Sequence, residues 1–428
     1  MYNKTYHSPA RAAEHMHEPS RYLQHFSSSH DAARDGDPVA LSHATPHLYP
    51  IHGPRSRAIA CPNSAPFDPH ATLSLPKVTC ADLLSSRLPH MAHSVRLVLG
   101  VTSAPNKWGR KIRDGIRRTW WTYPSVNRSV VVCFVVGRKS VKQREQVKLY
   151  SEAARYGDIA ILPHVRDGDG PFVTISKAHA WFRLASELLG LITTGDAEFS
   201  NSSRSVIGGY KATEAHPVRH IAKVDDDTFL NLPVLQRDLD SLHCRKHLYY
   251  GIFAFAGYNS VTYTKCGFDY GNKGGRYRRY GCAVAANGHG AAHPPFPWTS
   301  GALMLASTPL IVRIAAEPAI GDFVERSKLR HVQLGRVKST DEDVAMGFYM
   351  SRFHLGGLAN VTYVRINDQL TNLGCARNGG LYRRPNPRDV GKHFVKTAGG
   401  HAYVWSIVVD GMAPNVTRCI QWTGDGRL

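Results

Sequence analysis

From residue 94 onward the chain alternates between short runs of β-branched residues and amphipathic segments. Strands are expected at 95–101 and 130–137, with helices at 108–121 and 141–156. This alternation is typical of βαβ units around a parallel sheet. Residues 130–137 are apolar throughout, which indicates a central strand covered on both faces. The pattern therefore predicts an α/β fold with helices packed around a parallel sheet.

The same patterns predict the remaining elements. Strands are expected at 158–162, 220–224, 248–254 and 302–305, and helices at 174–191, from 233, at 309–316 and at 341–350. The polar stretch 193–219, rich in Ser and Gly, is interpreted as a surface insertion. Residues 257–297 are typical of a long loop that closes over a ligand.

Residues 1–93 have a different composition. They hold 11 of the 23 histidines together with many Ser and Pro residues, and they show neither helical nor strand periodicity. Such a stretch lacks the apolar pattern that a packed core needs. We therefore predict a low-complexity, stem-like or disordered region at 1–93 and one folded domain at 94–428.

The formal net charge of +20 is concentrated in the predicted folded domain. Residues 94–428 hold 45 Lys and Arg against 26 Asp and Glu, whereas residues 1–93 are nearly balanced. A field of this sign attracts phosphate groups on a nucleotide, a nucleic acid, a membrane surface or an anionic glycan. Charge alone does not choose among these partners.

The eight cysteines are widely spaced and contain no C-x-x-C pair, which favours disulfides over a zinc site. Glycosylation sequons occur at Asn3, Asn127, Asn201, Asn360 and Asn415. Disulfides and N-linked glycans share a lumenal compartment, so both signals indicate one. The first 60 residues hold no apolar run near the roughly 20 residues that span a bilayer. Either a targeting segment is missing from this sequence or the lumenal assignment is wrong.

The sharpest local signal is K-V-D-D-D-T-F-L-N at 223–231, an expected strand that ends in three carboxylates. Adjacent carboxylates repel one another unless a cation neutralises them. Hard oxygen ligands suit Mn²⁺ or Mg²⁺, which often complete their coordination with a diphosphate. The alternative is an exposed acidic turn in which Asp227 caps the following helix.

Other phosphate and hydrolase chemistries lack their motifs. A phosphohydrolase D-x-D-x-T/V motif fails because Phe229 stands where Thr or Val is needed. The chain contains neither a G-x-x-x-x-G-K-S/T phosphate loop nor a G-x-S-x-G elbow. The metal-plus-diphosphate interpretation remains.

A second acidic cluster, S-T-D-E-D-V-A-M-G at 339–347, opens a predicted helix. Taken alone, these carboxylates are explained as helix caps and dipole partners. Two acidic sites together fit inverting sugar transfer, which needs a metal for the leaving diphosphate and a separate carboxylate for the acceptor proton.

Several ordered motifs now show a family resemblance. They are R-D-G-I-R-R-T-W at 113–120, E-A-A-R-Y-G-D-I at 152–159, Thr174 with Lys177, the triplet at 223–231, Tyr280 with P-P-F-P-W-T-S-G-A at 294–302, and E-D-V-A-M-G at 342–347. Over residues 94–370 the chain resembles the β1,3-glycosyltransferase family of β1,3-galactosyl-, β1,3-N-acetylglucosaminyl- and Fringe-type transferases. It is most similar to the divergent trypanosomatid members.

The resemblance implies roles for individual residues. Asp343 would be the catalytic base, and Asp225 and Asp227 would flank the metal. A C-terminal histidine is a further expected ligand, for which His401 fits, with His354 and His393 as competitors. The nucleotide-sugar is expected to bind near Arg113, Arg117, Lys177, Lys223, Asp226 and Glu342. The loop beside the donor or acceptor would include Trp298, Ser300 and Gly301.

The resemblance also implies the fold and the reaction. The domain at 94–428 would adopt the GT-A nucleotide-diphospho-sugar transferase fold, with a twisted, mixed but mostly parallel sheet flanked by helices. The enzyme would move galactose or N-acetylglucosamine from a UDP-sugar to a hydroxyl of a glycan or glycoprotein, in β1,3 linkage, with inversion and with Mn²⁺ or Mg²⁺. Its expected location is the Golgi membrane, reached through a segment missing from this sequence, with a lumenal catalytic domain.

Two other classes stay open at this point. A basic nucleic-acid-binding protein would explain the charge and the Y-R-R-Y run at 277–280, but it leaves both acidic motifs unexplained, so no nucleic acid is expected. A non-catalytic, glycan-binding relative would use the same pocket without needing Asp343.

Overall fold

A computed structural model describes residues 48–51, 59–62, 71–85, 94–167, 171–192, 217–259, 264–269, 292–318, 320–325, 342–355, 360–373 and 385–412. Its strands are β1 (Leu48–Pro50), β2 (Leu97–Thr102), β3 (Val130–Lys139), β4 (Ile159–Arg166), β5 (His220–Asp225), β6 (Phe229–Leu230), β7 (Leu248–Asn259), β8 (Thr264–Asp269), β9 (Ala292–Ser307), β10 (Thr362–Arg365), β11 (Leu370–Asn372) and β12 (Gly391–His393). Its helices are α2 (Cys80–Leu84), α3 (Lys107–Arg117), α4 (Gln143–Tyr156), α5 (Pro171–Leu188), α6 (Leu232–Ser241), α7 (Thr308–Ala316), α9 (Glu342–Leu355) and α10 (Ala398–Val408), with 3-10 turns at Ala71–Ser74 and Trp120–Thr122.

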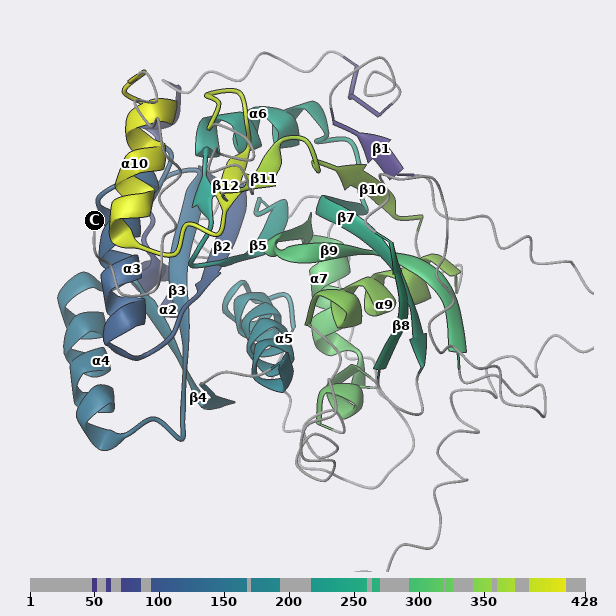
Figure 1. Cartoon of the computed structure of the whole chain (residues 1–428), viewed down its shortest axis with the longest axis horizontal. Helices are drawn as coiled ribbons and strands as arrows, with labels where there is room; N and C mark the ends of the chain where they lie inside the picture. The colour runs from purple at the N-terminus through teal and green to yellow at the C-terminus, as the bar shows by residue number, and fades with distance from the viewer. Residues whose placement is uncertain are drawn as a thin grey trace, which may run out of the picture. The chain divides into compact units, whose positions relative to one another are not determined.

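The large sheet has the strand order β1-β10-β7-β9-β5-β2-β3-β4, and β8 pairs with β7 (Figure 1). The strands β5, β2, β3 and β4 run parallel, whereas β9 is antiparallel to both β5 and β7. Helices α3, α4 and α5 connect the parallel strands, as the sequence pattern predicted. The predicted α/β fold with a mixed, mostly parallel sheet is confirmed.

Two hydrophobic cores cover the two faces of this sheet. The odd-numbered residues of β3 from 131 to 135 belong to the core that contains α5, α7 and α9. The even-numbered residues from 130 to 136 belong to the core that contains α3, α6 and α10. Because successive side chains of a strand point to opposite faces, a strand buried on both faces must be apolar throughout. The prediction that β3 is covered on both faces is confirmed, but β3 lies next to the edge strand β4 and not at the centre of the sheet.

The antiparallel strands differ from the sequence-based expectation. Residues 257–297 were expected to form a loop, but β7 continues to Asn259, β8 follows, and β9 begins at Ala292. Their backbone groups pair across β7–β8 and β7–β9, an interaction that local composition does not reveal. Tyr280, the run at 277–280 and most of the predicted insertion at 193–219 lie outside the described residues.

A small second sheet, ordered β11-β12-β6, lies next to the end of β5 and was not predicted. Strand β12 runs parallel to β11 and antiparallel to β6. These strands are two or three residues long, too short to show a period of two. The sheet brings residues near 393 beside residues that follow position 225 in the chain.

Parts of the stretch 1–93 pack onto the domain. Strand β1 pairs with β10, and Cys80 and Leu83 of α2 are buried. Disulfides join Cys61 to Cys244 and Cys80 to Cys133. The described fold therefore begins before the predicted boundary at residue 94. The helices within the described ranges include none with the length and apolar character to cross a bilayer.

The Cys80–Cys133 disulfide is expected to stabilise the fold by closing a loop of 53 residues. The chain-entropy model gives about 4 kcal/mol for a loop of this size. We expect the double variant Cys80→Ala, Cys133→Ala to lose about this free energy of unfolding in urea titrations. Peptide mapping under non-reducing conditions is the control, and free thiols at both positions in the wild type would contradict the assignment.

Candidate active site

The acidic triplet lies at the carboxyl end of β5, as expected for a ligand site in an open α/β sheet. Thr102 at the end of β2 is in register with Asp225, and its hydroxyl donates to the Asp225 carboxylate at 3.1 Å. The Lys223 ammonium is 2.7 Å from the same carboxylate, and Lys223 is only 1% exposed. Lys223 and Asp225 point to the same side of β5 because they are two residues apart.

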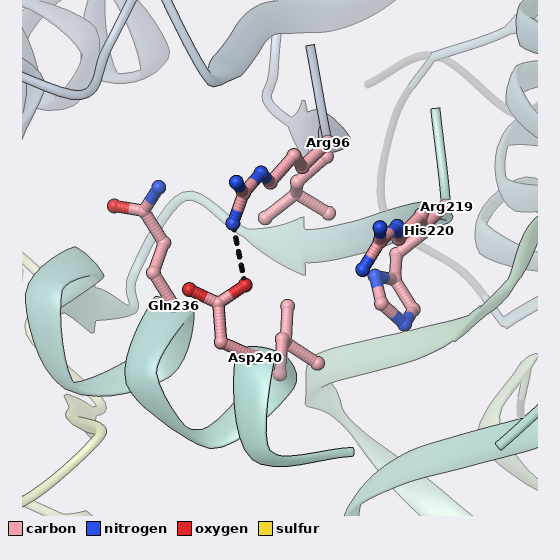
Figure 2. A pocket seen from close by; sticks show the side chains of 7 residues that line it. Arg96, Arg219, His220, Gln236 and Asp240 are labelled. Atoms are coloured by element: carbon pink, nitrogen blue, oxygen red, sulfur yellow. Dashed lines mark hydrogen bonds and ion pairs between the residues drawn. The ribbon is translucent and has the colours of Figure 1, made fainter. Parts of the chain in front are cut away.

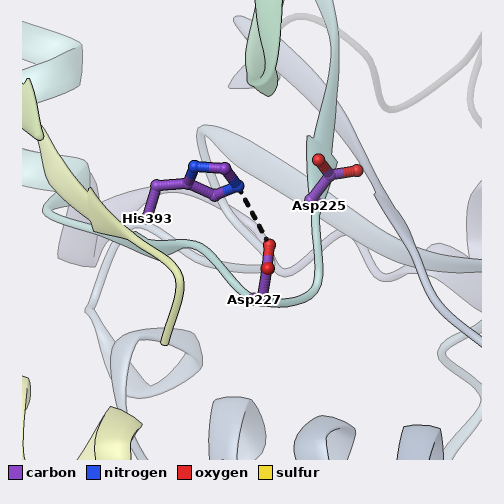
Figure 3. A group of neighbouring side chains, drawn as sticks. All are labelled: Asp225, Asp227 and His393. Carbon is purple, nitrogen blue, oxygen red and sulfur yellow. Dashed lines mark ion pairs between the residues drawn. The ribbon is translucent and has the colours of Figure 1, made fainter. Parts of the chain in front are cut away.

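Asp227 meets the small second sheet. The carbonyl of Asp227 accepts a hydrogen bond from the Val395 amide at 2.7 Å, and Nε2 of His393 lies 3.3 Å from Oδ1 of Asp227. Figure 3 shows His393 facing Asp227, with Asp225 beside them. Ligand atoms of Asp225, Asp227 and His393 all lie within 4.8 Å of one another.

The group fits a divalent cation. Two ligands at adjacent octahedral positions around Mg²⁺ or a similar ion are about 3.0 Å apart, close to the His393–Asp227 separation. His393 also contacts Oδ1 of Asn372 through Nδ1 at 3.0 Å. If Nδ1 donates its proton to Asn372, Nε2 of the neutral ring points its lone pair at the Asp227 carboxylate. These two electron-rich atoms repel each other unless a proton or a metal ion lies between them. The buried Oδ1 of Asp227 makes no hydrogen bond of good geometry, which leaves it available to a cation.

Electrostatics keep Asp227 ionised. Burial by itself raises the pKa of this carboxyl, but His393 and Lys396 outweigh burial and hold the pKa well below its usual range. Asp227 therefore offers a carboxylate, not an acid, to any cation at physiological pH.

The expected metal ligand His401 lies elsewhere. His401 is fully buried, and its Nε2 is 3.1 Å from the backbone carbonyl of Asp226. Burial lowers the pKa of His401 to about 4, so the ring is neutral and supports the turn that carries the triplet. The candidate metal-binding group of Asp225, Asp227 and His393 contains His393 in place of His401. His393 is one of the two competing histidines named from the sequence. The other, His354, has its side chain outside the described residues.

The second acidic motif comes to the first through Gly301. A Cβ built on Gly301 would lie 2.8 Å from Asp225 Oδ2, 3.0 Å from Asp343 Oδ1 and 3.0 Å from Lys223 Nζ. Two carboxylates and an ammonium thus converge on one glycine of β9. Any larger residue at 301 would occupy the space between the acidic groups.

Packing at Gly347 sets the position of Asp343. A Cβ on Gly347 would lie 2.3 Å from Cβ of Trp298, so only glycine lets α9 approach β9 this closely. Gly347 stands one helical turn after Asp343, which explains why both residues belong to one motif. Trp298 is 3% exposed and therefore serves packing, whereas Ser300 is half-buried beside the site. The side chain of Glu342 is outside the described residues.

The two motif arginines form an internal ion-pair network. Arg113 is fully buried and makes a bidentate pair with Glu152, with nitrogen–oxygen distances of 2.9 and 2.6 Å. Arg117 pairs with Asp158 at 2.8 and 2.9 Å and lies over the Tyr156 ring at 3.9 Å. The sequence predicted both arginines as nucleotide contacts, but these donors are committed to carboxylates of α4 and of the β4 entrance.

Ser103 links this network to the triplet. Arg113 donates to the Ser103 hydroxyl at 2.9 Å, and the Ser103 side chain also hydrogen bonds Asp226. Enclosure of the carboxyl raises the pKa of Asp226 to about 7, with further contributions from Asp227 and Asp225. Lys177 is buried and donates to Asp167 at 2.7 Å and to the Ser103 carbonyl at 3.2 Å. Lys177 therefore ties together the loops that follow β2 and β4.

A separate pocket lies at the opposite ends of β2 and β5 (Figure 2). Arg96 pairs there with Asp240 at 2.7 Å. Burial lowers the pKa of His220 to about 3, so this histidine stays neutral. The pocket faces the amino-terminal edge of the sheet and is not part of the candidate site.

The Arg113–Glu152 pair generates a stability prediction. Glu152 pairs with the buried Arg113 and also lies 2.9 Å from the half-buried Arg117. Glu152→Gln leaves both guanidinium groups without this carboxylate, which costs roughly 3–5 kcal/mol for a broken buried pair. Burial raises the pKa of Glu152, but Arg113 and Arg117 outweigh it and hold that pKa below normal. The folded-state pKa is thus depressed, so the stabilisation is present above about pH 4.5 and disappears as the pH falls through the folded value. Urea titrations from pH 7 to pH 3 should show the wild-type advantage shrinking; an advantage independent of pH would contradict this account.

The histidine geometry generates a binding prediction. We expect His393→Ala to weaken Mn²⁺ binding at least about 100-fold and Asn372→Ala to weaken it about tenfold, because Asn372 orients the imidazole. His243→Ala, at an exposed histidine outside the site, is the matched control and should leave the affinity unchanged. His401→Gln should weaken binding less than His393→Ala, because His401 supports the acidic turn from a buried position. Isothermal titration calorimetry measures all four. A larger loss in His401→Gln than in His393→Ala would reverse the assignment.

Comparisons with known proteins bear on the family. The chain is 29% identical to a hydroxyproline O-galactosyltransferase of Arabidopsis thaliana, 27% identical to a β1,3-galactosyltransferase of the same plant, and 29% identical to a β1,3-galactosyltransferase of Schizosaccharomyces pombe. Each match covers 36% of this chain. The matches cover 18%, 19% and 46% of the relatives, so the chain spans less than half the length of each. No protein-family model matches the chain. The predicted resemblance is nevertheless confirmed: the chain is similar in sequence to galactosyltransferases of the β1,3-glycosyltransferase family.

Proposed function

We propose that this protein is an inverting glycosyltransferase of the GT-A fold that moves galactose from UDP-galactose to a glycan hydroxyl in β1,3 linkage. The observation that carries the proposal is the convergence of Asp225, Asp343 and Lys223 on Gly301. This convergence brings the candidate metal-binding group close to a separate carboxylate, that of Asp343. Sugar transfer by direct displacement needs both parts. The names of the relatives favour galactose over N-acetylglucosamine.

Asp343 is the proposed base. Its carboxylate accepts the proton of the acceptor hydroxyl while that oxygen forms a bond to the anomeric carbon. The bond from the anomeric carbon to the diphosphate oxygen breaks, its electron pair leaves with UDP, and the configuration inverts. Asp343 is half-buried, and together with burial its negative charge raises the pKa of the Tyr249 hydroxyl, so Asp343 lies at the edge of a low-dielectric core.

The other charged residues serve the donor. Asp225, Asp227 and His393 would hold Mn²⁺ or Mg²⁺, which neutralises charge on the leaving diphosphate when bound. Lys223 holds Asp225 in place and contributes a buried positive charge beside it. The Ser103 hydroxyl accepts a hydrogen bond from Arg113 and also hydrogen bonds Asp226. It thereby orients Asp226 in the acidic turn. In this proposal the two motif arginines support the site from behind and do not touch the nucleotide.

The compartment is also proposed. The two disulfides support an oxidising, lumenal environment. We propose residence at the Golgi membrane, with glycans of glycoproteins as acceptors. Immunofluorescence of the full-length protein against a Golgi marker tests the location, and diffuse cytoplasmic staining would contradict it.

The reaction is tested by UDP release from a panel of UDP-sugars with Mn²⁺ and simple glycan acceptors. We expect turnover with UDP-galactose, and a loss of at least about 10³-fold in kcat for Asp343→Asn because a general base contributes roughly 10²–10⁴-fold. UDP binding by this variant should be unchanged, since the base acts on the acceptor.

The matched control is Asp322→Asn, an exposed carboxylate of the segment 320–325, which should retain full activity. Wild-type protein that consumes no UDP-sugar would sink the proposed reaction. An Asp343→Asn variant with normal kcat would place the base at another residue. Glycan binding without UDP-sugar turnover, unchanged in Asp343→Asn, would instead favour a non-catalytic, glycan-binding relative.

A further inference from the structure

Lys396 contacts the candidate metal site but belongs to none of the recognised motifs. Its ammonium pairs with Oδ2 of Asp227, while His393 faces Oδ1 of the same carboxylate. The Lys396 side chain is 48% exposed, in contrast to Asp227, which is 9% exposed. A flexible, half-solvated cation thus rests on a buried carboxylate.

The backbone that presents Lys396 is held in an unfavourable conformation. Phe394 has a φ of 63°, a left-handed value that is rare for a bulky residue. Its ring is stacked on His393 with centroids 4.2 Å apart, and the Lys396 ammonium lies 5.0 Å from the ring centroid. The turn is fixed by the hydrogen bond from Val395 N–H to the Asp227 carbonyl. Such strain persists only where the surroundings enforce it and is concentrated at functional sites.

A divalent cation at this site would repel the Lys396 ammonium. A cation held by Asp225, Asp227 and His393 would lie within a few ångströms of the Lys396 ammonium, because both would contact Asp227. Like charges at that distance repel strongly in a partly buried setting. The exposed stem of Lys396 lets the ammonium leave at little cost, whereas Lys223 is buried and committed to Asp225.

The diphosphate is a fitting destination for the displaced ammonium. The carboxylates of Asp225 and Asp227 already neutralise a bound divalent cation. A diphosphate that binds to this cation therefore adds negative charge that no residue of the group compensates, and this charge increases as UDP leaves. A mobile lysine at the rim can meet that charge as a point donor.

Building on the proposed function, we propose that Lys396 exchanges partners: a divalent cation displaces it from Asp227, and it then pairs with the diphosphate of the nucleotide-sugar. Lys396 thereby opposes metal binding in the free protein and favours nucleotide binding in the metal-loaded protein. Its removal has effects of opposite sign on the two steps, which a purely structural lysine would not produce.

The test uses the full chain with Lys396→Met, which keeps the stem and removes the charge. Calorimetry without nucleotide should show Mn²⁺ binding tightened about fivefold, the value of a partly exposed ion pair. At saturating Mn²⁺, UDP should bind about tenfold more weakly, as expected for the loss of one charge-assisted contact. Lys396→Arg should recover most of the UDP affinity. Lys111→Met, at an exposed position of α3, is the matched control and should change neither value.

Several results would overturn the inference. Unchanged or weaker Mn²⁺ binding by folded Lys396→Met shows that the lysine does not compete with the metal. Unchanged UDP affinity at saturating Mn²⁺ shows that it does not reach the diphosphate. Wild-type protein without measurable Mn²⁺ binding removes the basis for exchange. If both shifts appear but no galactose is transferred from UDP-galactose, the exchange at Lys396 stands and the proposed reaction fails.

Discussion

Repulsion among three consecutive carboxylates at the end of β5 is the constraint around which the candidate site is arranged. The two outer carboxylates have counter-charges from different parts of the chain: Lys223 of the same strand pairs with Asp225, and Lys396 pairs with Asp227, which His393 also faces. Burial and the two neighbouring carboxylates raise the pKa of Asp226 to about 7, so the middle carboxyl relieves the repulsion by taking up a proton near neutral pH. Without these partners, adjacent ionised carboxylates would be costly to hold in a half-buried turn.

These counter-charges explain why the C-terminal part of the chain belongs to the site. Strand β12 is antiparallel to β6, the two-residue strand that directly follows the triplet, and thereby brings in His393. Helix α10 packs against α3 where Gly115 leaves room: a Cβ there would lie 2.6 Å from Cα of Ala398. The contact places His401 under the turn of Asp226. The C-terminal elements thus buttress the acidic turn and supply the imidazole beside it.

Glycines allow close packing at the site, and buried ion pairs hold the neighbouring helices in place. Gly301 and Gly347 let β9 and α9 approach until Asp343 shares a space with Asp225. The arginines of α3 and the carboxylates Glu152 and Asp158 lock α3, α4 and the β4 entrance together behind that space. The motifs at 113–120 and 152–159, of which the first was expected to contact the nucleotide, therefore pair with each other and support the site. A guanidinium carries five N–H donors and a permanent charge, so a buried one requires fixed acceptors such as these carboxylates.

The sequence by itself determined the alternation of strands and helices, the burial of β3 on both faces, and the location of the acidic triplet and Asp343 at element ends. These features follow from local periodicity and from the cost of adjacent charges, which depend on near neighbours in the chain. Only the tertiary structure decided that His393 and not His401 stands beside Asp227, that Arg113 and Arg117 turn inward, and that Lys396 reaches the site. It also showed that β1 and two disulfides tie part of the stretch 1–93 to the domain. Each of these depends on pairings between distant residues, from 39 positions apart for Arg113 and Glu152 to the pairing of Leu48 with Tyr363, and no local pattern encodes which distant partner a side chain will meet.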